Sequence, residues 1–198
     1  MRQAQLAALF GAALLAGSAV FPVRAQTDDV FAFIPPGGRT LIAQAVAEGL
    51  PADELAAILA ARRTREEWIA YLTDRQGSVP ALQDLGEIEI ATLADYLAFH
   101  MPTTAVAAQS DAGTLERTLP PDGRDYTLDY CQSCHIITVV VTQDRTPEAW
   151  HGSLNKPSHI EIKLSKEQRE EMVNYLVLNA GIPIDLVPEE LRAGGASY

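Results

Sequence analysis

Residues 131–135 read Cys-Gln-Ser-Cys-His (CQSCH), and they hold both cysteines of this 198-residue chain. Two thiols that lie three residues apart, directly before a histidine, have three common uses. They can exchange with disulfides as a redox pair, supply half of a zinc site, or form two thioether bonds to a haem. The sequence around the motif distinguishes between these uses.

The N-terminus predicts export. Arg2 precedes an apolar run from Leu6 to about Phe21, and small residues at positions 23 and 25 fit a cleavage site after Ala25. The run is shorter than the ~20 apolar residues that span a bilayer, which is typical of a secretory signal peptide over residues 1–25. An uncleaved membrane anchor is the alternative. We expect a soluble periplasmic protein with no membrane-spanning segment after cleavage.

Acidic side chains dominate the composition. The chain has 26 Asp and Glu against 15 Lys and Arg, a formal net charge of −11, and the predicted signal peptide carries two of the arginines and no acid. Nucleic acid is therefore excluded as a partner, because phosphate binding requires positive charge. An acidic surface suits a basic docking partner or simple solubility.

The thioether use fits the motif best. A thioredoxin-like pair should follow a strand, whereas CQSCH follows GRDYTLDY, which predicts a helix. Zinc would need a second pair of ligands at a suitable spacing, and the sequence has none. Cys-x-x-Cys-His in an exported protein is typical of covalent haem attachment. We expect Cys131 and Cys134 to bond one haem c, and His135 to bind its iron as the proximal ligand.

Residues 123–198 resemble a class I cytochrome c. The resemblance rests on Gly123 eight residues before Cys131, on CQSCH, on the Trp-bearing segment RTPEAWHGSL, and on a last segment, LSKEQREEMVNYLVLNAG, with Tyr175-Leu176. It implies an all-α, mono-haem domain over residues 121–198. Residues 136–142 (IITVVVT) have strand propensity, but the resemblance implies an extended loop beneath the haem.

Local signals predict the same helices without the family. Thr146 followed by Pro147 is typical of a helix start, and Ser165 with Gln168 matches a capping box. Gly181 predicts the end of the last helix. The apolar stripe expected on that helix consists of Met172, Val173, Leu176, Val177 and Ala180.

The sixth iron ligand departs from the family pattern. Class I domains usually supply a Met from the loop before the last helix, and here that loop, NKPSHIEIK (155–163), holds His159 and no Met. We expect His159 to be the distal ligand. His151, Met172 and an open or water-bound iron remain alternatives, although Met172 is expected in the core. A bis-histidine iron would lack the thioether that raises the potential of His/Met cytochromes.

The first half of the chain repeats features of the second. Arg-Thr-x-Glu-x-Trp occurs at 63–68 and 145–150, and Tyr-Leu occurs at 96–97 and 175–176. We predict that residues 26–101 form a second, degenerate cytochrome c-like helical domain that has lost its haem. When Trp68 is aligned with Trp150, the position of the second Cys is occupied by Ala52, which cannot bond a haem. A coincidental pair of helices is the alternative. The side chains expected to replace the porphyrin are Phe31, Phe33, Ile58, Leu59 and Trp68. Residues 102–120 are expected to be an extended linker.

Two functions follow from these expectations. In the first, one covalent haem transfers electrons as the cytochrome subunit of a periplasmic oxidoreductase, and the haemless half docks a catalytic dehydrogenase subunit. In the second, an iron with an open sixth site binds a gas or peroxide. We find no nucleophile–base pair, so we do not expect an autonomous enzyme.

Overall fold

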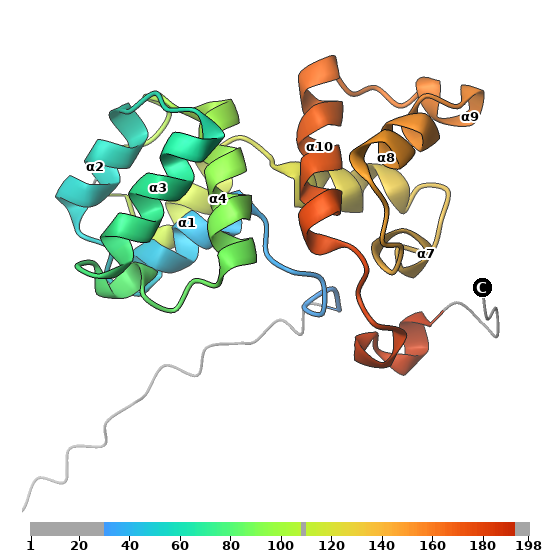
Figure 1. Cartoon of the computed structure of the whole chain (residues 1–198), viewed down its shortest axis with the longest axis horizontal. Helices are drawn as coiled ribbons and strands as arrows, with labels where there is room; N and C mark the ends of the chain where they lie inside the picture. Colours follow the sequence, from blue (N-terminus) through green and yellow to red (C-terminus); the bar gives the residue numbers. More distant parts are fainter. Residues whose placement is uncertain (1–29, 108–109, 193–198) are drawn as a thin grey trace, which may run out of the picture. The chain divides into compact units, whose positions relative to one another are not determined.

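Every regular element of the structure is a helix within residues 30–107 and 110–192, which are the residues that the computed structural model describes (Figure 1). The predicted all-α class is confirmed, whereas the predicted signal peptide lies outside the described residues. In this part of the chain no helix combines the length and the apolar character that a membrane span requires. The elements before residue 120 are α1 (Gly38–Ala47), α2 (Ala52–Ala60), α3 (Arg65–Gln76), the 3-10 turn η1 (Pro80–Leu82), α4 (Glu87–His100) and α5 (Ala112–Thr118). The later elements are α6 (Gly123–Tyr126), the π-helical turn η2 (Thr127–Cys131), α7 (Thr138–Val141), α8 (Pro147–Leu154), α9 (Pro157–Ile160), α10 (Lys166–Asn179) and the 3-10 turns η3 (Ile184–Leu186) and η4 (Glu189–Leu191).

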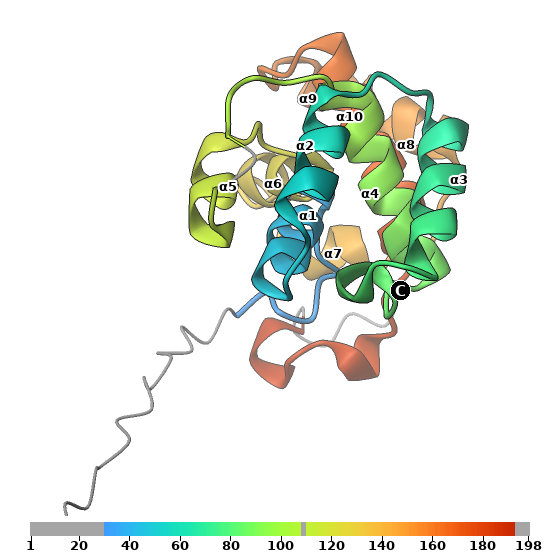
Figure 2. The same cartoon turned by 90° about the vertical axis from the view of Figure 1, so that its left-hand side faces the viewer.

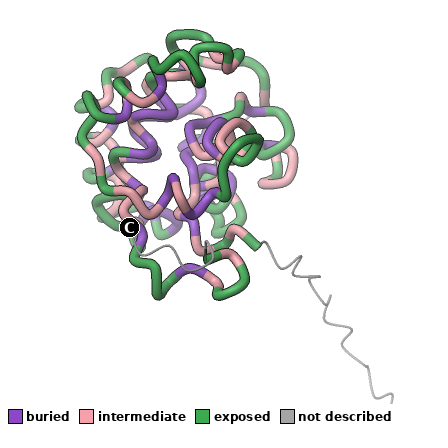
Figure 3. The backbone as a smooth tube through the Cα atoms, turned by 90° about the vertical axis from the view of Figure 1, so that its right-hand side faces the viewer, coloured by how far each residue is buried: buried purple, intermediate pink, exposed green. Residues whose placement is uncertain are grey.

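Two hydrophobic cores organise these helices, and the buried stretches are purple in Figure 3. The first core is built by α1–α5 and includes Trp68 and Leu115, which are fully buried. The second core surrounds Trp150 and Met172. The described residues from Phe31 onward nevertheless form one compact unit, and side chains and backbone groups from each half contact the other.

The predicted helix boundaries in the second half are confirmed. Thr146 accepts a hydrogen bond from the Ala149 N–H, and Ser165 with Gln168 forms the capping box of α10. Helix α10 ends before Gly181, whose positive φ of 82° suits glycine. The stripe on α10 is buried at Met172, Val173 and Leu176, but Val177 is 38% exposed, so the prediction is wrong at that residue.

In each half a glycine at the start of one helix lies against a tyrosine of another helix. Gly38 of α1 lies against the Cβ of Tyr96 on α4, and Gly123 of α6 lies against the Cβ of Tyr175 on α10. A Cβ built on Gly123 would fall 2.5 Å from the Tyr175 Cβ and 2.6 Å from the Glu171 carbonyl oxygen. Only a residue without a side chain allows these helices to approach so closely.

The segments before these glycines repeat each other and are exchanged between the cores. Ile34-Pro35-Pro36-Gly37-Gly38-Arg39 and Leu119-Pro120-Pro121-Asp122-Gly123-Arg124 are 85 residues apart. Ile34 is buried in the second core and Leu119 in the first. The Tyr96 hydroxyl donates to the Pro120 carbonyl at 3.1 Å, and the Tyr175 hydroxyl donates to the Pro35 carbonyl at 2.6 Å.

Helices α4 and α10 contact each other through a reciprocal pair of hydrogen bonds. His100 Nε2 lies 2.9 Å from Glu171 Oε1, and the Asn179 side-chain amide donates to the Thr92 hydroxyl at 3.0 Å. In both pairs a residue four positions before one tyrosine meets a residue four positions after the other. The two pairs are therefore related to each other by exchange of α4 and α10.

Three expectations are corrected. Residues 138–141 of IITVVVT form helix α7, because Thr142 and its neighbours satisfy their amides locally and not through a strand partner. Helix α5 interrupts the predicted extended linker and packs on α1, where Leu115 and Leu119 fill the first core (Figure 2). Phe31 and Phe33 pack against the second core and therefore do not fill the first. Ile58, Leu59 and Trp68 are buried in the first core as expected, and Leu115 and Leu119 from the supposed linker add to its filling.

The glycine contacts predict that replacement by alanine lowers the free energy of unfolding at two glycines and raises it at a third. Gly38→Ala and Gly123→Ala should each lower the free energy of unfolding by about 2–3 kcal/mol, because the new methyl group forces two packed helices apart. Gly152→Ala is the matched control: it lies in α8 with no atom near its Cβ position, and the change should add about 0.5–1 kcal/mol. Urea unfolding of the three variants measures this. Equal effects at all three glycines would contradict the packing described here.

Candidate functional site

The CQSCH motif begins at the last residue of the π-helical turn η2 and continues as a tight turn. The amides of Cys134 and His135 both donate to the Cys131 carbonyl, at 3.3 and 3.0 Å. The two thiols therefore lie one turn apart on the same segment, and the histidine follows immediately. Single π-helical turns occur frequently at functional sites, since the extra residue shifts the side chains that follow it.

The two cysteines differ in their surroundings. Cys131 is half-buried against the second core, whereas Cys134 is exposed, and both are free thiols. Burial raises the pKa of the Cys131 thiol to about 11, and the neighbouring Cys134 adds to this shift. Thiol exchange requires a thiolate near neutral pH. This arrangement disfavours a redox dithiol.

The rings of His135 and His159 lie next to each other. Their ring centroids are 6.0 Å apart and their planes are inclined by 36°. Two imidazoles on opposite sides of one metal ion would have centroids roughly 6 Å apart, because each metal–nitrogen bond is about 2 Å long. His159 lies on the short helix α9, where the sequence predicts a loop.

The backbone holds His159 through one ring nitrogen. Its Nδ1 lies 2.9 Å from the Ser153 carbonyl oxygen, at hydrogen-bond distance. Histidines that bind metals usually donate their second N–H in this way, which orients the ring and leaves Nε2 for the metal. Ser153 is itself fixed, because its hydroxyl accepts from Arg145 Nη1 at 2.6 Å and donates to the Ala149 carbonyl.

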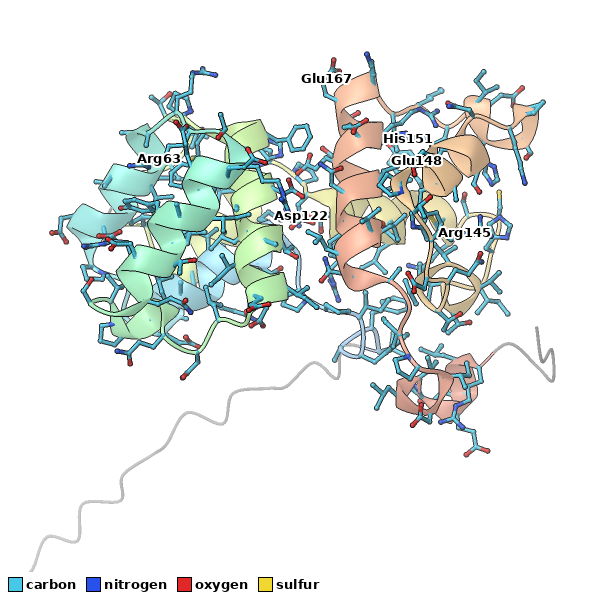
Figure 4. All side chains as sticks on the ribbon, in the orientation of Figure 1. Arg63, Asp122, Arg145, Glu148, His151 and Glu167 are labelled. Atoms are coloured by element: carbon cyan, nitrogen blue, oxygen red, sulfur yellow. The ribbon has the colours of Figure 1, made fainter. Side chains whose placement is uncertain are left out.

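The two other ligand candidates lie elsewhere. His151 is on α8 with its Nε2 3.4 Å from the Glu170 carboxylate, and it is labelled in Figure 4. Met172 is fully buried in the second core, where the sequence predicts it. Of the three candidates, the ring contact with His135 is made by His159. The structure thus places the ring of His159 beside that of His135, which lies in the same turn as Cys131 and Cys134.

The donor set fits a haem better than a bare metal ion. Within residues 30–107 and 110–192, no three or more His, Cys, Asp or Glu side chains are arranged so that they could hold a metal ion. A porphyrin supplies most of the iron ligands itself, so two protein ligands suffice. Cys134, His135 and the apolar Ile136, which is 54% exposed, are all accessible to a planar apolar group.

Both tryptophans lie in matching surroundings. The Arg145 guanidinium lies 5.2 Å from the Trp150 ring, and the Arg63 guanidinium lies 4.5 Å from the Trp68 ring (Figure 4). Each indole N–H is buried without a hydrogen-bond partner. A haem propionate could satisfy the Trp150 N–H. Because Trp68 has the same unpaired N–H in the half without a CQSCH motif, this feature alone does not identify a haem pocket.

A second cluster of titratable groups lies between α4 and α10. Asp95, Asp122 and Glu171 line a cavity with room for about one water molecule. Each carboxylate has a partner. Asp95 pairs with Arg65 at 3.0 Å, Asp122 accepts from the Arg39 amide at 2.9 Å, and Glu171 contacts His100. Burial raises the pKa of Asp95 to about 6 and also raises the pKa of Glu171. The cluster lies where the two halves meet, and its cavity is too small to bind a substrate.

Comparison with known proteins adds no relative. No family description, no curated protein and no solved structure matches this chain. The assignment of the site therefore depends on its residues and geometry.

Sequence reasoning did not identify several residues that shape the site. Ser153 acts through its main-chain carbonyl, which any residue has, so no sequence signal marks it. Arg169, which contacts the backbone around His159, is equally inconspicuous. The repeat of Pro-Pro-x-Gly-Arg at 35–39 and 120–124 was readable in the sequence and would have aligned the halves at Gly38 and Gly123.

The buried carboxylate of Asp95 predicts a stability that depends on pH. Its pKa is raised by burial, opposed by Arg65 and reinforced by Glu66 and Glu170. The folded state therefore binds the proton more tightly than the unfolded chain does, and ionisation costs stability as the pH rises from about 4 to about 6. Asp95→Asn should be more stable than the wild type by about 2 kcal/mol at pH 7, and the difference should shrink toward pH 4.

Urea unfolding at several pH values tests this dependence. Asp111→Asn is the control with the opposite sign, because hydrogen bonds from Thr114 lower the pKa of Asp111. That variant should lose more stability at pH 7 than at low pH. A difference between Asp95→Asn and wild type that is the same at every pH would contradict the raised pKa.

Proposed function

We propose that this chain is an exported mono-haem c-type cytochrome that transfers electrons, with its haem bonded to Cys131 and Cys134. The observation that carries the proposal is the pair of neighbouring histidine rings, His135 and His159, of which His135 lies in the turn that holds both thiols. The raised pKa of Cys131 counts against the competing use of the motif in thiol exchange.

The residues around the proposed site have separable roles. Cys131 and Cys134 would anchor the porphyrin edge, and His135 would bind the iron from the same turn. His159 would bind from the other face, with its ring oriented by the Ser153 carbonyl. The bound haem would supply a one-electron carrier. Two histidine ligands would give it a lower potential than a His/Met pair, because a thioether ligand favours the reduced iron.

We infer further that the first half is a degenerate copy of the haem domain. The support is a set of matched features: the glycine–tyrosine contacts, the arginine–tryptophan stacks and the exchanged prolines. If Gly38 is matched with Gly123, the positions of Cys131, Cys134 and His135 correspond to Val46, Gly49 and Leu50. This register replaces the one that placed the second Cys at Ala52.

The first half in this proposal has a structural and docking role. Leu50, in the position of the proximal histidine, is buried in the first core, and α5 adds Leu115 and Leu119. Apolar side chains therefore occupy the volume that a porphyrin would need. A domain without redox chemistry that is retained beside a haem domain suits a subunit which docks a periplasmic catalytic dehydrogenase. The acidic composition would favour a basic docking surface on that partner.

The first test concerns the haem itself. The native protein, denatured and extracted with acidified acetone, should keep its haem on the polypeptide, and its intact mass should correspond to one haem per chain. The double variant Cys131→Ala/Cys134→Ala should release the colour to the solvent. Loss of haem from the wild type would refute covalent attachment, and two haems per chain would refute the degenerate first half.

The second test concerns the distal ligand. His159→Ala should convert a six-coordinate, low-spin iron to a high-spin or water-bound one that binds carbon monoxide or cyanide readily. His159→Met should keep six-coordination and raise the potential, since a thioether replaces an imidazole. His151→Ala is the control and should leave the spectrum unchanged.

The same spectra separate electron transfer from gas or peroxide binding. A wild-type iron that already binds carbon monoxide readily would favour the second function. If the spectrum of His159→Ala matches that of the wild type, the ligand lies elsewhere, and His151 and then Met172 are the next residues to replace.

A further inference from the structure

Helix α9, which carries His159, has little packing of its own. It is a single turn, Pro157–Ile160, and none of its residues is buried. Ile160 is 66% exposed. An isolated turn of this length is unstable in water, because its few hydrogen bonds do not offset the conformational entropy lost. Something outside α9 must therefore hold it.

One side chain contacts the backbone on both sides of this turn. Arg169, in the first turn of α10, donates from Nη1 to the Leu154 carbonyl at 3.4 Å. From Nη2 it contacts the carbonyls of His159 at 3.3 Å, Ile160 at 3.4 Å and Ile162 at 2.6 Å. The planar guanidinium can reach several acceptors at once, which an ammonium group cannot do equally well.

These carbonyls lie where a cation is most favourable. Leu154 is the last residue of α8 and Ile160 is the last residue of α9. The final carbonyls of a helix have no partner within the helix, and the helix dipole makes that end negative. No carboxylate of residues 30–107 and 110–192 forms an ion pair with Arg169. Its charge is therefore directed to the ends of two short helices.

We propose that Arg169 is a positioning residue that holds α9, and through it the ring of His159, in place opposite His135. The inference rests on the proposed function for its consequence at the iron, but the contact itself does not. Arg169 caps α8 and α9 together, which keeps the Ser153 carbonyl and the His159 ring within hydrogen-bond distance. Without it, His159 would leave the iron more often.

The experiment uses the full chain as purified and compares Arg169→Met with Lys166→Met. Lys166 is an exposed residue at the start of the same helix, so its replacement removes the same charge without touching α9. Hydrogen exchange at the amides of residues 159–162 should be about tenfold faster or more in Arg169→Met and unchanged in Lys166→Met. Cyanide should bind the ferric iron faster by a similar factor, because it must wait for His159 to dissociate.

Arg169→Lys is the second variant, and it covers the case in which Arg169→Met does not fold. It keeps the positive charge but lacks the planar guanidinium that reaches several carbonyls at once. The rates of hydrogen exchange and of cyanide binding should therefore be intermediate. Unchanged exchange at residues 159–162 in both variants would overturn the proposal whatever the iron does.

The readouts also distinguish the two levels of inference. Faster exchange together with faster cyanide binding supports the positioning role. In another outcome, hydrogen exchange is faster in Arg169→Met, but cyanide binding is unchanged both in that variant and in His159→Ala. This would support the contact between Arg169 and α9. That result would instead refute His159 as the distal ligand.

Discussion

The contact between a glycine backbone and the Cβ of a tyrosine is the constraint on which both halves of this molecule depend. It brings α1 against α4 and α6 against α10 at a distance that no other residue allows. The close approach also points each tyrosine hydroxyl away from its own half, toward the proline carbonyl that precedes the other glycine. The two helix pairs and the link between them therefore have the same origin.

The exchange of segments makes the halves interdependent. Ile34 completes the second core and Leu119 completes the first, so neither core is closed by its own half. A helical domain of this size has a small core, and support from a neighbour compensates for it. The interface that joins them is polar, with buried Asp95, Asp122 and Glu171. Burial of these acids costs stability above their pKa, but the contact of Glu171 with His100 helps to specify one arrangement of α4 against α10.

The proposed haem site is built on weaker elements than the cores. The π-helical turn η2 and helices α7 and α9 are each five residues or fewer, and their stability comes from contacts with longer helices. Arg169 from α10 and the Arg145–Ser153 hydrogen bond supply such contacts on the His159 side. This arrangement would suit the proposed haem site, because longer helices hold the short segments in place while those segments stay accessible.

The helical class, the main helix boundaries of the second half and the buried position of Met172 could be predicted from the sequence, which also named the four residues of the candidate site as a hypothesis. These follow from caps, from apolar spacing and from a short motif, all of which are local in the chain. The sequence did not determine α7, because β-branched residues have strand propensity, whereas the amides of residues 139–142 donate to carbonyls three or four residues earlier. Nor did it determine where α5, Phe31 and Phe33 pack, since apolar side chains fit either core. Tertiary structure also decided that a main-chain carbonyl orients His159 and that one arginine serves two helix ends. Such contacts depend on distance in space between backbone groups that every residue shares, and a sequence pattern cannot reveal them.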